Sequence, residues 1–327
     1  MNASSLPPDL QEIREFLPGM IHRLEECIPY VSALVTQESG TTLRLDSRRE
    51  IIAERQPRRG IVFTLFNGRF FQEWATDNLD RKFLEAKTGE MCRLFNTMET
   101  IEPRFTIAPG DPVDQHYTSE FEIDPDSVKL TDMIGECRDL IKRLHGMDSR
   151  IANTSINYHD GREFKIFANR SRVLSSALTT CTIHLVVVGA HNGTVKMNFI
   201  GAGGVTGFEA TRLPEEGLQE MIDDLNLLFQ SKPLEPGVYD VISSPQVSGI
   251  LAHEAFGHGV EADMYVKERA KAAHYMNRPV ASSLVDMVDD PSLPGLHGHY
   301  FFDDEGQLAG PTRIIAKGVL NRALPDL

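Results

Sequence analysis

Four stretches of the chain repeat apolar residues at steps of three and four, the spacing that places side chains on one face of a helix. They span 10–28, 76–96, the segment from Pro125 to near Gly146, and about 214–229. The third is the most regular, with its apolar positions at Leu130, Met133, Ile134, Cys137, Leu140, Ile141 and Leu144. The pattern predicts four amphipathic helices, each with an apolar face that must pack against another element.

Between these stretches the chain is rich in β-branched and aromatic residues. Residues 30–37, 41–46 and 60–68 predict strands. Asp160-Gly161 and Asn192-Gly193 each separate two alternating runs, and both dipeptides supply the positive φ angles that tight hairpin turns require. We therefore expect an antiparallel meander between the third and fourth helices.

Hairpins outnumber strand–helix–strand crossovers, which indicates an α+β fold with antiparallel sheets and packed helices. Residues 97–126, rich in Pro and Asp, predict a loop. We expect an α+β region at 1–120 and a helix–β-meander–helix at 121–232, both in one N-terminal α/β domain. Residues 233–327 would begin a mainly β C-terminal domain with a linker at 231–237, a short strand at 238–243 and then a helix.

The composition is that of a globular protein, with 41% hydrophobic and 24% charged residues in 327. The net charge of −14 argues against nucleic acid or an anionic membrane as a partner, because both favour basic surfaces. The N-terminus shows no signal-peptide pattern, and no apolar run approaches the roughly 20 residues that span a bilayer. We expect a cytoplasmic protein.

The four cysteines are scattered and form no C-x-x-C pair. Their positions are Cys27, Cys92, Cys137 and Cys181. We expect four reduced thiols rather than a disulfide framework, as is usual for a cytoplasmic protein.

The segment "LAHEAFGHGVEAD" carries the candidate chemistry. Ser244 can cap the predicted helix and Pro245 fits its first turn. His253 and His258 are five residues apart, so on a regular α-helix they would point about 140° away from each other and could not bind one metal ion. Either a π-bulge lengthens one turn and brings them together, or Gly257 loosens the helix locally. The alternative is an ordinary helix with two unrelated histidines.

A metal held by both histidines would give the neighbouring carboxylates distinct roles. Glu254 would lie beside the metal as the general base that takes a proton from water. Glu261 and Asp263 are candidates to orient a histidine from behind.

The longer run "HEAFGHGVEAD" resembles the signature of the TldD/PmbA family of metallopeptidases. The downstream segment 282–326 is similar as well, notably at Asp289-Asp290, "PG" at 294–295, "FDDEG" at 302–306 and "GVL" at 318–320. The resemblance is strong over about 237–327, looser over 120–236 and weak before 100.

The resemblance implies a zinc-dependent peptidase that acts on unfolded or extended peptides. It implies a homodimer, or a heterodimer with a TldE-type subunit that lacks the motif. By motif position, His253 and His258 would be zinc ligands and Glu254 the general base, as in the TldD-type subunit.

The family's third protein ligand is a cysteine far downstream, and none of the four cysteines lies at a matching place. Because a catalytic zinc normally has three protein ligands, we expect a truncated chain with weak or absent zinc binding as it stands. His274, His297 and His299 are the candidate substitutes, and for the last two we favour a polar loop or a sheet edge.

Three other features give weaker signals. "GAGGVTGFEA" at 201–210 departs from G-x-G-x-x-G, because Thr stands at 206, and predicts a strand end or turn. "DDEG" at 303–306 lacks the spacing of an EF-hand and predicts a turn. No G-x-S-x-G elbow supports a serine hydrolase.

Two classes of function remain. The first is the zinc peptidase with Glu254 as base, and the second is a non-catalytic subunit that binds peptides or a partner through an incomplete site. Zinc content and cleavage distinguish them.

Overall fold

The computed structural model describes residues 5–96 and 106–324. The chain folds as two compact units. We call Met1–Lys232 with Pro294–Gln307 the sheet unit, and Pro233–Leu293 with Leu308–Leu327 the motif unit. Each is described by itself.

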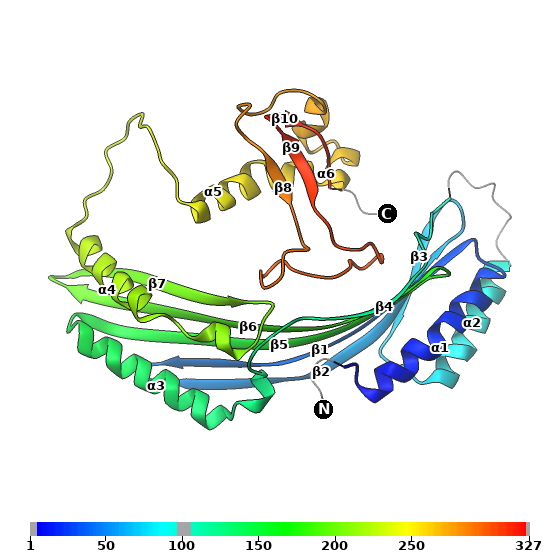
Figure 1. The fold of residues 1–327 in the computed structure, drawn as a ribbon, viewed down its shortest axis with the longest axis horizontal. Helices are drawn as coiled ribbons and strands as arrows, with labels where there is room; N and C mark the ends of the chain where they lie inside the picture. Colours follow the sequence, from blue (N-terminus) through cyan, green and yellow to red (C-terminus); the bar gives the residue numbers. More distant parts are fainter. Residues whose placement is uncertain (1–4, 97–105, 325–327) are drawn as a thin grey trace. The chain divides into compact units, whose positions relative to one another are not determined.

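One large sheet forms the centre of the sheet unit (Figure 1). Its strands are β1 (Tyr30–Asp46), β2 (Glu50–Phe66), β3 (Phe71–Thr76), β4 (Val113–Thr118), β5 (Ile151–Ala168), β6 (Arg172–His191) and β7 (Thr194–Gly204). Their order is β3-β2-β1-β5-β6-β4, and β7 pairs directly with residues 181–191 of β6, which follow the part of β6 that pairs with β4. All pairs are antiparallel except β4 with β6. The predicted α+β class with antiparallel sheets is confirmed.

The four helices of this unit pack on the same face of the sheet. They are α1 (Pro8–Glu25), α2 (Arg81–Asn96), α3 (Leu130–Met147) and α4 (Glu215–Gln230). The first two cover Val35 and Ile166, which are paired, and the other two cover Leu43 and Tyr158, which are also paired. Because side chains alternate across a strand, both core clusters lie on one face. The four predicted amphipathic helices are confirmed, within a few residues at their ends.

The opposite face of the sheet is mostly polar. Thr42, His159, Glu163 and Thr182 lie on it, and at its β7 edge Met197 is exposed. A sheet with one covered and one open face explains the alternation in the sequence.

The predicted hairpin at Asp160-Gly161 is wrong. β5 runs straight through both residues, and Gly161 pairs with Gly40 on β1. A Cβ atom at Gly40 would collide with the carbonyl oxygen of Asp160, so glycine serves close strand approach here rather than a turn. The hairpin at Asn192-Gly193 is confirmed, with φ of 49° and 77° between β6 and β7.

Three further strand predictions need correction. The stretches 30–37 and 41–46 form one strand, β1, whose polar middle contains a register shift between Glu38 and Gly40. The predicted loop 97–126 contains β4, an edge strand whose polar residues give no apolar alternation, while 97–105 lies outside the described residues. Residues 238–243 are not a strand, because within the described chain they pair with no other strand.

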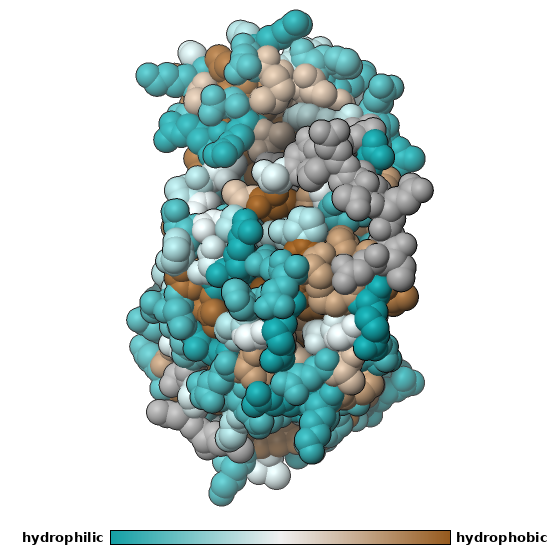
Figure 2. Space-filling model, turned by 90° about the vertical axis from the view of Figure 1, so that its right-hand side faces the viewer, coloured by the Kyte–Doolittle hydropathy of each residue, from teal (hydrophilic) through white to brown (hydrophobic). Residues whose placement is uncertain are grey.

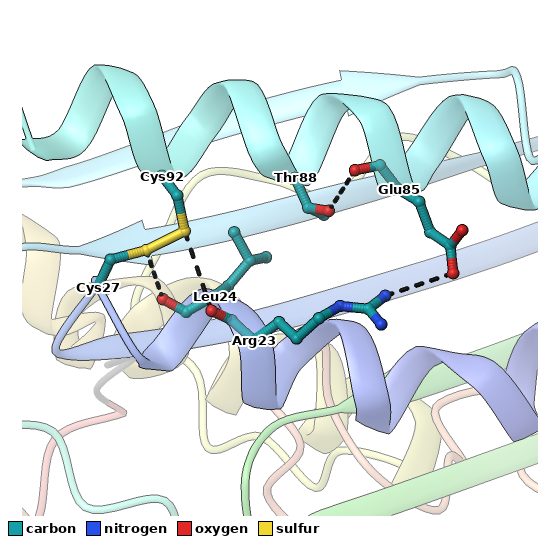
Figure 3. Close-up of a disulfide and its surroundings, with 6 residues drawn as sticks. All are labelled: Arg23, Leu24, Cys27, Glu85, Thr88 and Cys92. Atoms are coloured by element: carbon teal, nitrogen blue, oxygen red, sulfur yellow. Dashed lines mark hydrogen bonds and ion pairs between the residues drawn. A yellow bond between two sulfur atoms is a disulfide. The ribbon is translucent and has the colours of Figure 1, made fainter.

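A disulfide joins Cys27, just after α1, to Cys92 on α2 (Figure 3). The expectation of four reduced thiols is therefore wrong for this pair. The two helices pack side by side on the sheet, which brings together cysteines 65 residues apart in sequence. Cys137 and Cys181 are free and buried.

Residues 294–307 pack on the open face of the sheet. Phe302 is buried against Phe167 and Leu174, and Lys165 donates a 2.7 Å hydrogen bond to Asp304. Arg172, itself buried, donates to the carbonyl oxygen of Gly306 at 2.5 Å. The "DDEG" segment is the predicted turn.

The motif unit contains shorter elements. They are α5 (Pro245–Ala252), a π-helical turn (His253–Gly257), a 3₁₀ turn (His258–Val260), α6 (Ala262–Val266), a second 3₁₀ turn (Lys271–Tyr275), and the strands β8 (Met287–Asp289), β9 (Thr312–Ala316) and β10 (Val319–Leu320). The strands form one small sheet in the order β10-β9-β8. Its buried core consists of Val260, Ile314, Ile315 and Leu320.

The surface is mostly hydrophilic, in agreement with the share of charged residues in the chain. Figure 2 shows the side that carries α1 and α2, and most of the residues visible there are hydrophilic, with hydrophobic ones in small patches. Among the described helices, none is long and apolar enough to cross a membrane.

Candidate metal centre

α5 leads directly into the motif, and the sequence explains where this helix begins. The Ser244 hydroxyl oxygen accepts a hydrogen bond from the Val247 N–H at 3.4 Å, and Pro245 occupies the first turn. This capping satisfies one N–H that would otherwise have no partner, and it fixes where the helix begins. The predicted cap is confirmed.

The extra residue between the histidines is accommodated by a π-helical turn over His253–Gly257. The His258 N–H donates to the carbonyl oxygen of His253, five residues earlier, which lengthens the turn by one residue. The two imidazole rings are consequently neighbours, with centroids 4.5 Å apart and planes at 70°. Of the two ways foreseen to bring the histidines together, the structure has the π-bulge.

His253, Glu254 and His258 each offer one ligand atom, and these atoms lie within 4.8 Å of one another. Two imidazole nitrogens bound to one tetrahedral zinc ion are about 3.3 Å apart, so a small adjustment would place both on the same ion. All three side chains are exposed. The donor set therefore fits a zinc ion through two nitrogens, with Glu254 beside it.

Glu261 holds the ring of His258. The His258 Nδ1 lies 2.8 Å from Glu261 Oε1, which favours the proton on Nδ1 and leaves Nε2 available for a metal. Asp263 forms an ion pair with Lys267 at 2.6 Å instead, and the hydrogen bond from Lys267 lowers the pKa of Asp263. Of the two acidic residues expected to orient a histidine, Glu261 is the one whose carboxylate contacts a histidine ring.

The other histidines considered as ligands lie elsewhere in the chain. His274 is on the second 3₁₀ turn of the motif unit, while His297 and His299 belong to the sheet unit. Among the described residues, the close group of metal-binding side chains includes none of the three.

A cavity of about 830 Å³ lies beside the centre, and no pattern in the sequence predicts it. His258 forms part of its wall, together with Phe256, Met264 and Tyr275. These residues come together only through the short turns that follow the motif, whose apolar spacing shows no regular period.

Two histidines and a glutamate on a distorted helix thus form a group that could hold a metal ion. Residues 236–327 match the family model of the PmbA/TldA metallopeptidase C-terminal domain. This match and the relatives below confirm the resemblance to the TldD/PmbA family.

The curated relatives are named metalloproteases. One from Methanocaldococcus jannaschii is 26% identical over 73% of this chain and 52% of its own length. One from Synechocystis is 25% identical over 95% of this chain and 67% of its own. A zinc metalloprotease TldD homolog from Saccharolobus solfataricus is 26% identical over 59% of this chain and 44% of its own. The chain spans about half the length of the first of these relatives.

Solved structures show the same fold. A crystal structure from Bacteroides thetaiotaomicron has a TM-score of 0.78 and 17% identity, covering 98% of this chain and 73% of that one. TldE from Thermococcus kodakarensis has a TM-score of 0.69 and 12% identity, covering 95% and 70%.

Proposed function

We propose that this chain is the catalytic type of subunit in a zinc-dependent peptidase that cleaves unfolded or extended peptides. The observation that carries the proposal is the π-helical turn, since it places two imidazoles and one carboxylate in one group on a segment that matches a metallopeptidase family. A distorted turn of this kind has no evident use in an ordinary helix, and π-bulges are frequent at functional sites.

Each residue has a role that follows from its position. His253 and His258 would hold the zinc ion, which, when bound, supplies a Lewis acid that polarises the scissile carbonyl group. Glu254 takes a proton from the attacking water and passes it to the leaving amine. Glu261 keeps the His258 ring oriented through its 2.8 Å contact.

The experiment compares cleavage of an unfolded, fluorescently labelled peptide by the wild-type chain, Glu254→Gln and His253→Ala. Glu254→Gln should lose about 10²- to 10⁴-fold in rate, the usual contribution of a general base, and His253→Ala should lose activity because it removes a zinc ligand. Zinc content is measured with zinc in excess, because the chain offers two histidine ligands rather than three protein ligands, and it should fall only in His253→Ala. Glu235→Gln, an exposed glutamate in the same unit, is the matched control and should cleave normally. Unchanged turnover in Glu254→Gln would refute the mechanism.

A non-catalytic binding subunit is the second candidate. Two histidines in the close group, rather than the three protein ligands usual in catalytic zinc sites, are the observation that favours it. Peptide binding with no cleavage at any zinc concentration would support this candidate over the first.

The resemblance also supports assembly into a dimer, either with a second copy or with a TldE-type subunit. Light scattering of the chain alone and mixed with such a subunit tests this proposal. A cytoplasmic location stays a prediction.

A further inference from the structure

The cavity beside the candidate centre has the size of a ligand site. Its volume of about 830 Å³ falls within the roughly 300–1,000 Å³ of small-molecule pockets, and its walls come entirely from the motif unit. His258 is shared between the cavity and the group of potential metal ligands. A molecule held by its reacting bond at that group would therefore reach directly into the cavity.

The walls next to His258 are apolar. Phe256 packs against the core of the unit on one side and lines the cavity on the other. Met264 and Tyr275 complete this part of the wall, and 47% of the Tyr275 surface is exposed. Methionine and aromatic side chains give a wall that adapts to large apolar groups.

The rim of the cavity is cationic. Arg269 and Lys271 line it and are exposed, and among the described residues no Asp or Glu does so. The chain as a whole carries a net charge of −14. Asp263 lies near Arg269 outside the lining, so the excess of positive charge is confined to the lining itself. Such a site attracts carboxylates.

We propose that this cavity selects the substrate. It takes a large apolar side chain adjacent to the scissile bond, in a peptide that also carries a carboxylate within reach of Arg269 and Lys271. This inference rests on the proposed peptidase function. The carboxylate can be that of an acidic residue or of the peptide's own C-terminus, and both would make the same charge-assisted hydrogen bonds.

The experiment measures binding without relying on turnover. Fluorescein-labelled eight-residue peptides are titrated with the full chain after removal of metal, and Kd is read by anisotropy. The parent peptide has one Phe followed by Asp and ends in an amide. In its relatives Phe becomes Ala, Asp becomes Asn, or Asn is combined with a free C-terminal carboxylate.

The expected pattern has two parts. Replacing Phe by Ala should weaken binding at least tenfold, because the apolar wall loses its contact. Replacing Asp by Asn should weaken it about threefold to tenfold, and restoration by the free C-terminus would identify the terminal carboxylate as an equivalent source.

Variants of the protein test which residues produce each peptide preference. Arg269→Gln/Lys271→Gln should remove the preference for Asp over Asn while leaving the preference for Phe. Ala281→Phe, at an exposed position lining the cavity, should narrow it and reduce the preference for Phe. Arg278→Gln, an exposed cation outside the lining, is the matched control and should change neither.

The outcomes separate the two proposals. Equal affinity for the Phe and Ala peptides, or preferences that survive both pocket variants, would overturn the assignment of the cavity even if zinc-dependent cleavage is observed. The expected preferences together with no cleavage by any form of the chain would support the cavity and refute the peptidase.

Discussion

Among single residues, Glu209 shows how one carboxylate can hold a turn against a distant segment of the chain. It accepts hydrogen bonds from the Thr206 hydroxyl at 2.6 Å, the Gly207 N–H at 3.0 Å and the Ile123 N–H at 2.8 Å. Partial burial opposes its charge, but these bonds outweigh that effect and lower the pKa of Glu209 to about 2. The glycine-rich stretch before it thus ends in a turn held by a carboxylate.

This pKa predicts a pH dependence of stability. A carboxylate whose pKa falls on folding stabilises the native state above about pH 4.5, and that stabilisation is lost as the pH drops toward 2. Glu209→Gln should therefore be less stable at pH 7 by about 1–3 kcal/mol, and the difference should shrink between pH 5 and 3. Urea unfolding at these pH values checks it, with the exposed Glu220→Gln as control. A pH-independent difference would contradict the assignment.

At the scale of elements, the disulfide fastens α1 to α2. Figure 3 shows Cys27 and Cys92 at the same end of the helix pair, with the Arg23–Glu85 ion pair of 3.4 Å further along. The two free cysteines are different. Burial raises the pKa of Cys137 to about 11 and that of Cys181 to about 12, so both stay protonated at neutral pH and react slowly.

Reduction of the disulfide should therefore give two thiols, at Cys27 and Cys92, that react faster than the two buried ones. It should also lower the free energy of unfolding. Closing a loop across 65 residues contributes about 2–4 kcal/mol to the free energy of unfolding. We expect the melting temperature of the wild-type chain to fall on addition of dithiothreitol, and that of Cys27→Ser/Cys92→Ser to be low and unaffected. Two rapidly labelled thiols in the native chain before reduction would show that the bond is absent.

At the scale of the whole molecule, the two units differ in how much they bury. The core of the motif unit contains four buried hydrophobic residues, whereas each of the two large clusters of the sheet unit contains many more. Apolar burial is the main favourable term in folding, so the motif unit is the less stable of the two.

Hydrogen exchange should show this difference directly. Amides of β9 should exchange through an opening of lower free energy than those of β5 and β6, because local stability follows local burial. Mass spectrometry of peptic fragments checks it across the described residues. Equal protection of both units, lost together in one transition, would contradict the prediction.

The local features of the fold can be read from the sequence. Periodicity located the four helices, because an amphipathic helix records its buried face in every turn. Asn192-Gly193 predicted its hairpin, and Ser244 with Pro245 predicted the start of α5. The motif identified His253, Glu254 and His258 as the candidate site, and the five-residue spacing of the histidines required a distorted helix there.

Features that depend on residues far apart in the chain follow from the three-dimensional packing. Gly161 lies in a strand interior because Gly40 approaches it from β1, 121 residues earlier, so the same dipeptide pattern that forms one hairpin does not form the other. Cys27 meets Cys92 only because two helices share a face of the sheet. The choice of the π-bulge, the contact of Glu261 and the cavity beside His258 likewise arise from packing in three dimensions, which leaves no periodic trace in the sequence.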